Sequence, residues 1–177
     1  MSAGTLTKIR IWHAARDAYH CAFRMLRIAS AWQSAPLEME RLRILDMFLL
    51  APTLLHKISM PRQVRAQFEF LGVPEEREVF ESLPSVAAMF QELRIYQNAA
   101  ANHLLARDIF KSALISDGIV ELNNKSLPKS LIAEIAERNK ADQSIIDFLT
   151  SQLSTVPLSG DDNIYKRAGL PARHLIA

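Results

Sequence analysis

Residues 37–52 read LEMERLRILDMFLLAP, and this stretch decides the fold class. Leu42, Leu45 and Phe48 recur at helical spacing, while the charged residues lie mainly in the first half of the segment. The later half is apolar on nearly all sides, which indicates a buried helix that ends before Pro52. The stretch therefore predicts a helical fold in which this segment is part of the core.

Helical periodicity continues on both sides of this segment. Pro61 is suited to the first position of a helix, and Gly72 is suited to end it. Runs of β-branched residues that would mark long strands are scarce. Further helices are predicted over residues 13–32, 61–71, 84–96, 98–113, 130–138 and 144–153.

The periodicity changes after residue 116. Residues 119–122 read IVEL and are β-prone, and Asp117-Gly118 before them is a turn signal. We expect a short β-hairpin whose return strand is residues 125–127. Two closely joined helices followed by a small hairpin is the element order of the latter part of a winged helix. The predicted fold class is therefore mainly α, with a winged-helix-like element and one short β-hairpin.

The chain has 177 residues, which suits one domain. We divide it into an N-terminal helical region, residues 1–72, a winged-helix-like region, residues 73–156, and a C-terminal arm, residues 157–177. The three parts are expected to form one cooperative domain.

Charge and cysteine content limit the classes of protein to which this chain can belong. The formal net charge is +2, but residues 1–65 hold ten Lys or Arg against four Asp or Glu. The single cysteine, Cys21, excludes an internal disulfide, which favours a reducing compartment, and its apolar neighbours predict that it is buried. Basic residues interrupt the first apolar stretch, and Pro52 breaks the most apolar one. We therefore expect a soluble, cytoplasmic protein with no membrane contact.

The sequence contains no recognisable catalytic or cofactor-binding pattern. The five histidines are isolated, and no pair has the spacing of metal ligands on one helical face. Glycine-rich phosphate loops and a Gly-x-Ser-x-Gly motif are absent from the sequence. The sequence therefore predicts a protein that is not an enzyme, with no catalytic, metal or cofactor residue and no cofactor.

Two sets of polar residues are candidate contact sites. Charge reversal of Arg24 and Arg27 in the first set should leave stability nearly unchanged if that set lies on a polar helix face. An ordinary solvated face is the alternative interpretation for both sets. The partner-binding candidates are Arg16, Arg24, Arg27, Arg41 and Arg43, and the candidate DNA contacts on the second helix of the winged-helix-like region are Arg94, Asn98, Arg107 and Lys111.

Two segments carry a family resemblance. Residues 18–27 read AYHCAFRMLR, and residues 40–52 read ERLRILDMFLLAP. They resemble the middle-component proteins of bacterial ABC three-component systems, the group that includes the middle subunit of Lamassu-type antiphage defence. Those proteins have a Tyr-rich helix with Phe-Arg-x-Leu-Arg, then a helix with Arg-Leu-x-x-Leu-Asp and a short apolar run. The resemblance covers about residues 13–125, with Ala51-Pro52 where relatives often have Phe-Pro.

The resemblance implies a non-catalytic accessory subunit of a defence complex. Its partners would be an SMC-like coiled-coil ATPase and a nuclease effector, with double-stranded DNA reached through the complex. The resemblance implies no catalytic residue at any position of this chain. A free-standing winged-helix DNA-binding transcriptional regulator is the alternative, and neighbouring genes for an ATPase and a nuclease would distinguish the two.

Overall fold

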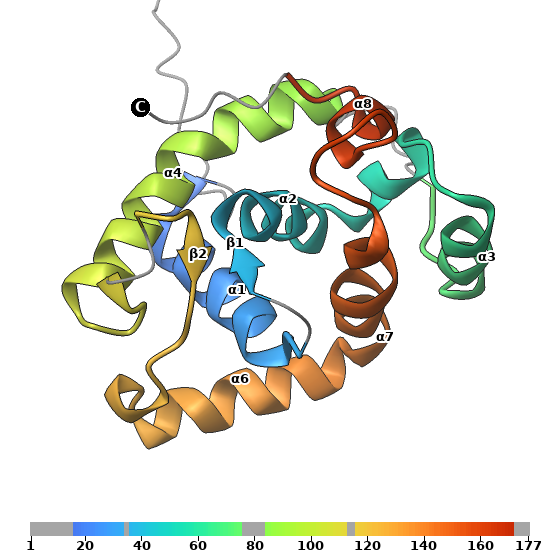
Figure 1. The fold of residues 1–177 in the computed structure, drawn as a ribbon. Coiled ribbons are helices and arrows are strands. Elements are labelled where there is room, and N and C mark those ends of the chain that lie inside the picture. The colour runs from blue at the N-terminus through green and yellow to red at the C-terminus, as the bar shows by residue number, and fades with distance from the viewer. Residues whose placement is uncertain (1–15, 34–35, 76–83, 113–115, 172–177) are drawn as a thin grey trace, which may run out of the picture.

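The computed structural model describes residues 16–33, 36–75, 84–112 and 116–171, and these residues are mainly helical, as predicted (Figure 1). The strands β1 (Leu37–Glu38) and β2 (Ile119–Val120) form one antiparallel pair. Short 3-10 helices cover Pro52–Lys57, Asn124–Ser126 and Leu153–Thr155, and the π-helical turn Phe148–Gln152 follows α7. The α-helices are α1 (Ala18–Ala31), α2 (Met39–Leu50), α3 (Arg62–Phe70), α4 (Val86–Ala106), α6 (Lys129–Ala141), α7 (Gln143–Asp147) and α8 (Ile164–Ala168).

Local residue chemistry explains where the first helices begin and end. The Asp17 side chain accepts the backbone N–H groups of Tyr19 at 2.7 Å and His20 at 3.1 Å, so it caps α1. Pro61 directly precedes α3, and Gly72 follows that helix with a φ of +63°. Both helix ends agree with the predictions. The part of the first predicted helix before residue 16 lies outside the described residues.

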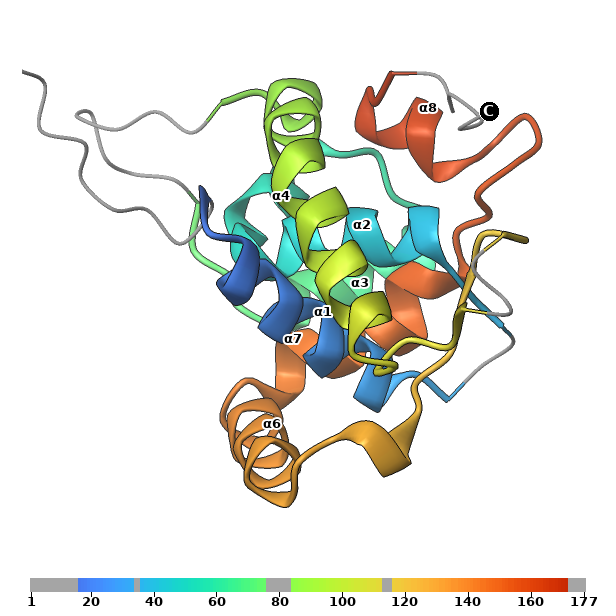
Figure 2. The same cartoon turned by 90° about the vertical axis from the view of Figure 1, so that its left-hand side faces the viewer.

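Helix α2 lies at the centre of the fold, with α1 and α4 packed against it (Figures 1 and 2). Leu42, Leu45 and Phe48 are fully buried, which confirms the predicted core helix. One hydrophobic cluster runs from Cys21 to Leu170 and so includes part of the C-terminal arm. Unfolding of the whole chain as one cooperative domain stays a prediction.

Helix α4 corrects the prediction of two helices over residues 84–113. It runs without interruption from Val86 to Ala106, and the Ser85 hydroxyl accepts the backbone N–H of Ala88 to cap it. The predicted break at Gln97-Asn98 is wrong, because the Gln97 side chain is buried and hydrogen-bonded inside the fold. Across residues 84–106 the structure therefore has one helix where the winged-helix-like element was inferred from two.

The β element forms, but its partners differ from those predicted. Val120 of β2 pairs with Leu37 of β1, which is far away in the sequence. A local antiparallel bridge also joins Phe110 and Leu122. Residues 125–127 are not the return strand, because the Asn123 side chain accepts the backbone N–H of Lys125 and stabilises a 3-10 turn there.

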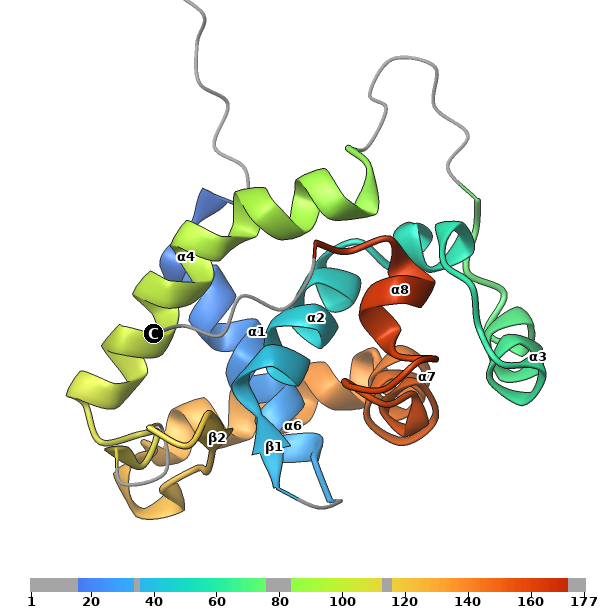
Figure 3. The ribbon, with the colours of Figure 1, turned by 45° about the horizontal axis from the view of Figure 1, so that its top comes forward.

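Two helices lie at the periphery. Helix α6 packs against α1 (Figure 1), and α3 lies at one edge (Figure 3), where the Phe68 ring is 5.7 Å from the Phe148 ring between centroids. Among the described helices, none combines the length and apolar character needed to cross a membrane.

Candidate functional site

A buried ion pair joins the two segments that carry the family resemblance. The Arg24 Nε atom of α1 donates to Asp46 Oδ1 of α2 at 2.7 Å, and its Nη2 atom donates to Asp46 Oδ2 at 3.3 Å. Asp46 is 0% exposed, and the Cys21 thiol also donates to it at 3.6 Å. A buried carboxylate needs such partners, because leaving it uncompensated is costly. This pair therefore fixes α1 against α2.

The polar network continues from Asp46 through α4 to α8. The Gln97 amide of α4 donates to Asp46 at 2.8 Å and to the Arg43 carbonyl at 2.9 Å. Arg43 returns a hydrogen bond to the Gln97 oxygen at 3.0 Å and forms an ion pair with Glu40 at 3.0 Å. The Tyr165 hydroxyl of α8 donates to Glu40 in turn. The network thus connects four helices.

Cys21 is part of this network and has no accessible surface. Burial and, to a smaller extent, the charge of Asp46 raise the pKa of the Cys21 thiol far above its ordinary value. The thiol therefore stays protonated, which makes it a poor nucleophile. The buried position predicted for Cys21 is confirmed.

Arg27 fastens α1 to the junction between α6 and α7. Its Nε atom donates to the Asn139 oxygen at 2.9 Å, and the Asn139 amide donates back to the Arg27 carbonyl at 2.9 Å. Its Nη2 atom forms an ion pair with Asp142 at 2.7 Å. Burial lowers the pKa of the Arg27 guanidinium below its ordinary value, and Asp142 opposes this change. We name Arg27, Asn139 and Asp142 the α6 clamp.

The two remaining candidates of the partner-binding set differ in burial. Arg41 is buried and donates to the carbonyl groups of Ser154 at 2.9 Å and Val156 at 3.0 Å. Arg16 is exposed and forms an ion pair with Glu92 of α4 at 2.9 Å. Arg41 therefore holds the chain after α7 against α2, while Arg16 contributes to the surface.

The expectation that this set forms one exposed basic face is wrong. Arg24, Arg27, Arg41 and Arg43 are buried, each with less than one tenth of its surface exposed. The reason is that each guanidinium meets a carboxylate, amide or carbonyl oxygen supplied by another part of the fold. Contact with a partner through residues of this set stays a prediction, and Arg16 is the one that is exposed.

The four candidate DNA contacts do not form one surface. Arg94 and Asn98 are exposed and lie one turn apart on α4. Arg107, at the end of that helix, contacts His103 at 2.8 Å, and Lys111 forms an ion pair with Glu121. About nine residues separate Asn98 from Arg107, which places them on opposite faces of a regular helix. DNA contact through these residues stays a prediction.

The network gives a testable consequence at Gln97, which is 1% exposed. We expect Gln97→Ala to lower the free energy of unfolding by about 1–3 kcal/mol, because Asp46 and Arg43 each lose a buried hydrogen-bond partner. Urea denaturation followed by circular dichroism measures this. The neighbouring exposed Asn98→Ala should change the same quantity by less than about 0.5 kcal/mol. Equal effects of the two changes would contradict the network.

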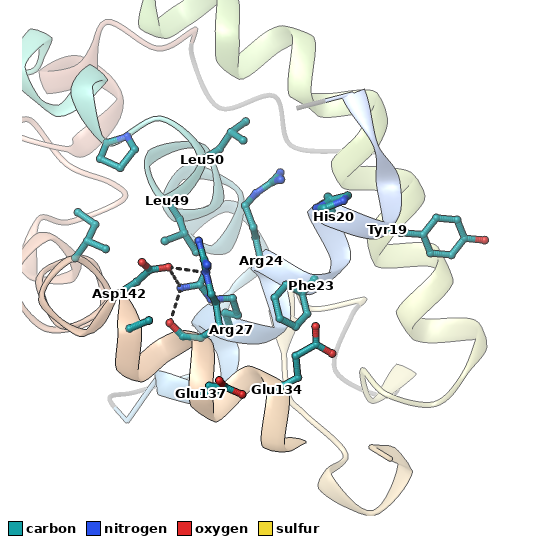
Figure 4. Close-up of a pocket in the computed structure, with 14 residues that line it drawn as sticks. Tyr19, His20, Phe23, Arg24, Arg27, Leu49, Leu50, Glu134, Glu137 and Asp142 are labelled. Carbon is teal, nitrogen blue, oxygen red and sulfur yellow. Dashed lines mark hydrogen bonds and ion pairs between the residues drawn. The ribbon is translucent and has the colours of Figure 1, made fainter. Parts of the chain in front are cut away.

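A groove of about 860 Å³ lies beside the α6 clamp (Figure 4). One wall is α1 with the end of α2, and the other wall is α6 with the start of α7. Because these walls are more than 80 residues apart in the chain, no local pattern could have indicated the groove. Its lining residues are Tyr19, His20, Phe23, Arg24, Arg27, Leu49, Leu50, Pro52, Glu134, Glu137, Arg138, Ala141, Asp142 and Ile145.

The groove combines an apolar surface with carboxylates, which is suited to binding side chains of another molecule. Phe23, Leu49 and Leu50 contribute partly buried apolar surface to one wall. Glu134 and Glu137 contribute exposed carboxylates to the other wall (Figure 4). Within the described ranges, no three His, Cys, Asp or Glu side chains are grouped so that they could hold a metal ion.

Comparison with known proteins gives one family. The family model described as ABC-three component (ABC-3C) system Middle Component 5 matches residues 10–174. The comparisons with curated proteins and with solved structures found no match. The matched range includes both segments that carry the resemblance and the whole of the polar network that joins them. The chain therefore belongs to the family of ABC-three component system Middle Component 5.

Proposed function

We propose that this protein is a non-catalytic adaptor subunit that binds an SMC-like coiled-coil ATPase and links it to a nuclease effector in antiphage or anti-plasmid defence. The observation that carries the proposal is the family match, because it covers residues 10–174 and describes the middle component of a three-component system. A middle component acts together with other components. The ATPase and the nuclease are the partners that the sequence resemblance implies.

The structure supports a binding role through the way it uses its polar residues. Arg24, Asp46 and Gln97 hold helices together inside the core. The groove beside the α6 clamp offers apolar surface and carboxylates to another molecule. A rigid helical core with an accessible groove is suited to an adaptor, because interface backbones in preorganised complexes move little on binding.

Co-expression tests the adaptor proposal. The chain and an SMC-like ATPase from the same three-component system should elute as one complex in size-exclusion chromatography at micromolar concentration. The purified chain alone should hydrolyse neither ATP nor DNA. Separate elution would contradict the adaptor role, and hydrolysis that persists through further purification would contradict the non-catalytic role.

A further inference from the structure

The groove has two walls of different chemistry, and the α6 clamp fixes the distance between them. Phe23 and the end of α2 form the apolar wall, and α6 carries the charged wall (Figure 4). Hydrogen bonds of 2.9 Å in both directions between Arg27 and Asn139 fix the separation of α1 and α6. The groove is therefore formed before any partner arrives, which lowers the entropic cost of binding.

The cations of the groove are already engaged within the chain. Arg24 pairs with Asp46 beneath the groove, and Arg27 and Arg138 share Asp142 at 2.7 and 3.1 Å. At this end of the groove, next to α7, each of the three arginines is therefore paired with a carboxylate of the chain itself.

Unlike these cations, the carboxylates of α6 are not engaged by other side chains in the described part of the chain. Glu134 and Glu137 are exposed and lie about one turn apart. Neither forms an ion pair or a side-chain hydrogen bond in the part of the chain that the structure describes. Glu134 and Phe23 both line the groove (Figure 4), so unmatched negative charge borders the apolar wall. A complementary ligand has apolar side chains and a nearby positive charge.

We infer that the groove between α1 and α6 is the docking site for an apolar segment of a companion protein that carries Lys or Arg opposite Glu134 and Glu137. The apolar side chains of that segment cover Phe23, Leu49 and Leu50, and its cations pair with the two carboxylates. This inference rests on the proposed adaptor function and specifies which surface performs it.

The charge of the groove selects a protein segment over other polymers. Nucleic acid presents phosphate groups, which Glu134 and Glu137 repel. A membrane surface with anionic headgroups is repelled for the same reason. A basic, apolar protein segment satisfies both walls at once.

Charge reversal tests the inference on the full chain. Glu134→Lys with Glu137→Lys should weaken binding of the co-expressed companion complex by about tenfold or more, because like charges then face each other. The matched control is Glu69→Lys with Asp117→Lys, which changes the net charge equally at exposed sites outside the groove. The control should keep the affinity within about twofold. Biolayer interferometry with the immobilised companion complex measures both variants.

A second variant separates docking from folding. Ala141 is exposed and lines the groove, so Ala141→Trp fills it without changing any charge. It should weaken the companion complex while the melting temperature stays within a few degrees of the wild type. Unchanged affinity in both the double charge reversal and Ala141→Trp would overturn the groove as the docking site.

The outcomes distinguish this inference from the proposed function. If the wild-type chain binds no companion, the adaptor proposal fails before the groove is tested. If the wild type binds and the groove variants bind equally well, the adaptor proposal stands and the groove inference is wrong. A homodimer in light scattering that the double reversal dissociates would show that a second copy occupies the groove, which also overturns the inference.

Discussion

Arg24→Ala is expected to lower the free energy of unfolding by about 3–5 kcal/mol. The change leaves the Asp46 carboxylate, which is 0% exposed, without the guanidinium that meets both of its oxygens. The Gln97 amide and the Cys21 thiol still donate to Asp46, but both groups are neutral and do not replace the paired charge of Arg24. Urea denaturation at neutral pH, followed by circular dichroism, measures the loss.

The control for this prediction is another arginine that forms an ion pair with a comparable distance. Arg16 pairs with Glu92 at 2.9 Å, but its side chain is 59% exposed. Arg16→Ala should therefore cost less than about 1 kcal/mol. If Arg24→Ala were as mild as Arg16→Ala, the buried ion pair would not be a main support of the fold.

Phe48→Ala is expected to lower the free energy of unfolding by about 3–5 kcal/mol. Phe48 is fully buried in α2 at the centre of the core, so truncation removes apolar contacts and leaves a cavity. The melting temperature and the midpoint of urea denaturation should both fall. Assembly with companion proteins should weaken in parallel with the loss of folded protein.

The chain supplies a matched control of the same residue type. Phe70 at the end of α3 is 91% exposed, so Phe70→Ala should change the free energy of unfolding by less than about 0.5 kcal/mol. Comparable losses for Phe48→Ala and Phe70→Ala would contradict the assignment of α2 to the centre of the core.

Local patterns predicted the parts of the fold that depend on neighbouring residues. The apolar spacing of Leu42, Leu45 and Phe48 gave the buried helix, and Pro61 and Gly72 gave the limits of α3. These signals lie within one or two helical turns, where periodicity and capping act. The burial of α2 and the limits of α3 were therefore accessible from the sequence, whereas the continuity of α4 was not.

Long-range polar pairing was not accessible in the same way. Arg24 follows the pattern of a polar helix face, but its partner Asp46 lies 22 residues away on another helix. Gln97 was interpreted as a helix end. Its side chain instead accepts a hydrogen bond from Arg43, 54 residues away, and donates one to Asp46, 51 residues away. A charge pattern along one helix does not indicate which side chains another helix brings to it. The same limit hid the groove, whose walls come from distant segments.

The proposed adaptor role is tested most directly by omitting this chain from its three-component system. The SMC-like ATPase would be immobilised, and retention of the nuclease effector would be measured with and without the chain at equal concentrations. The account predicts that the effector is retained when the chain is present and is lost when the chain is omitted. Equal retention of the effector without the chain would show that the two components associate directly, which would contradict the adaptor role.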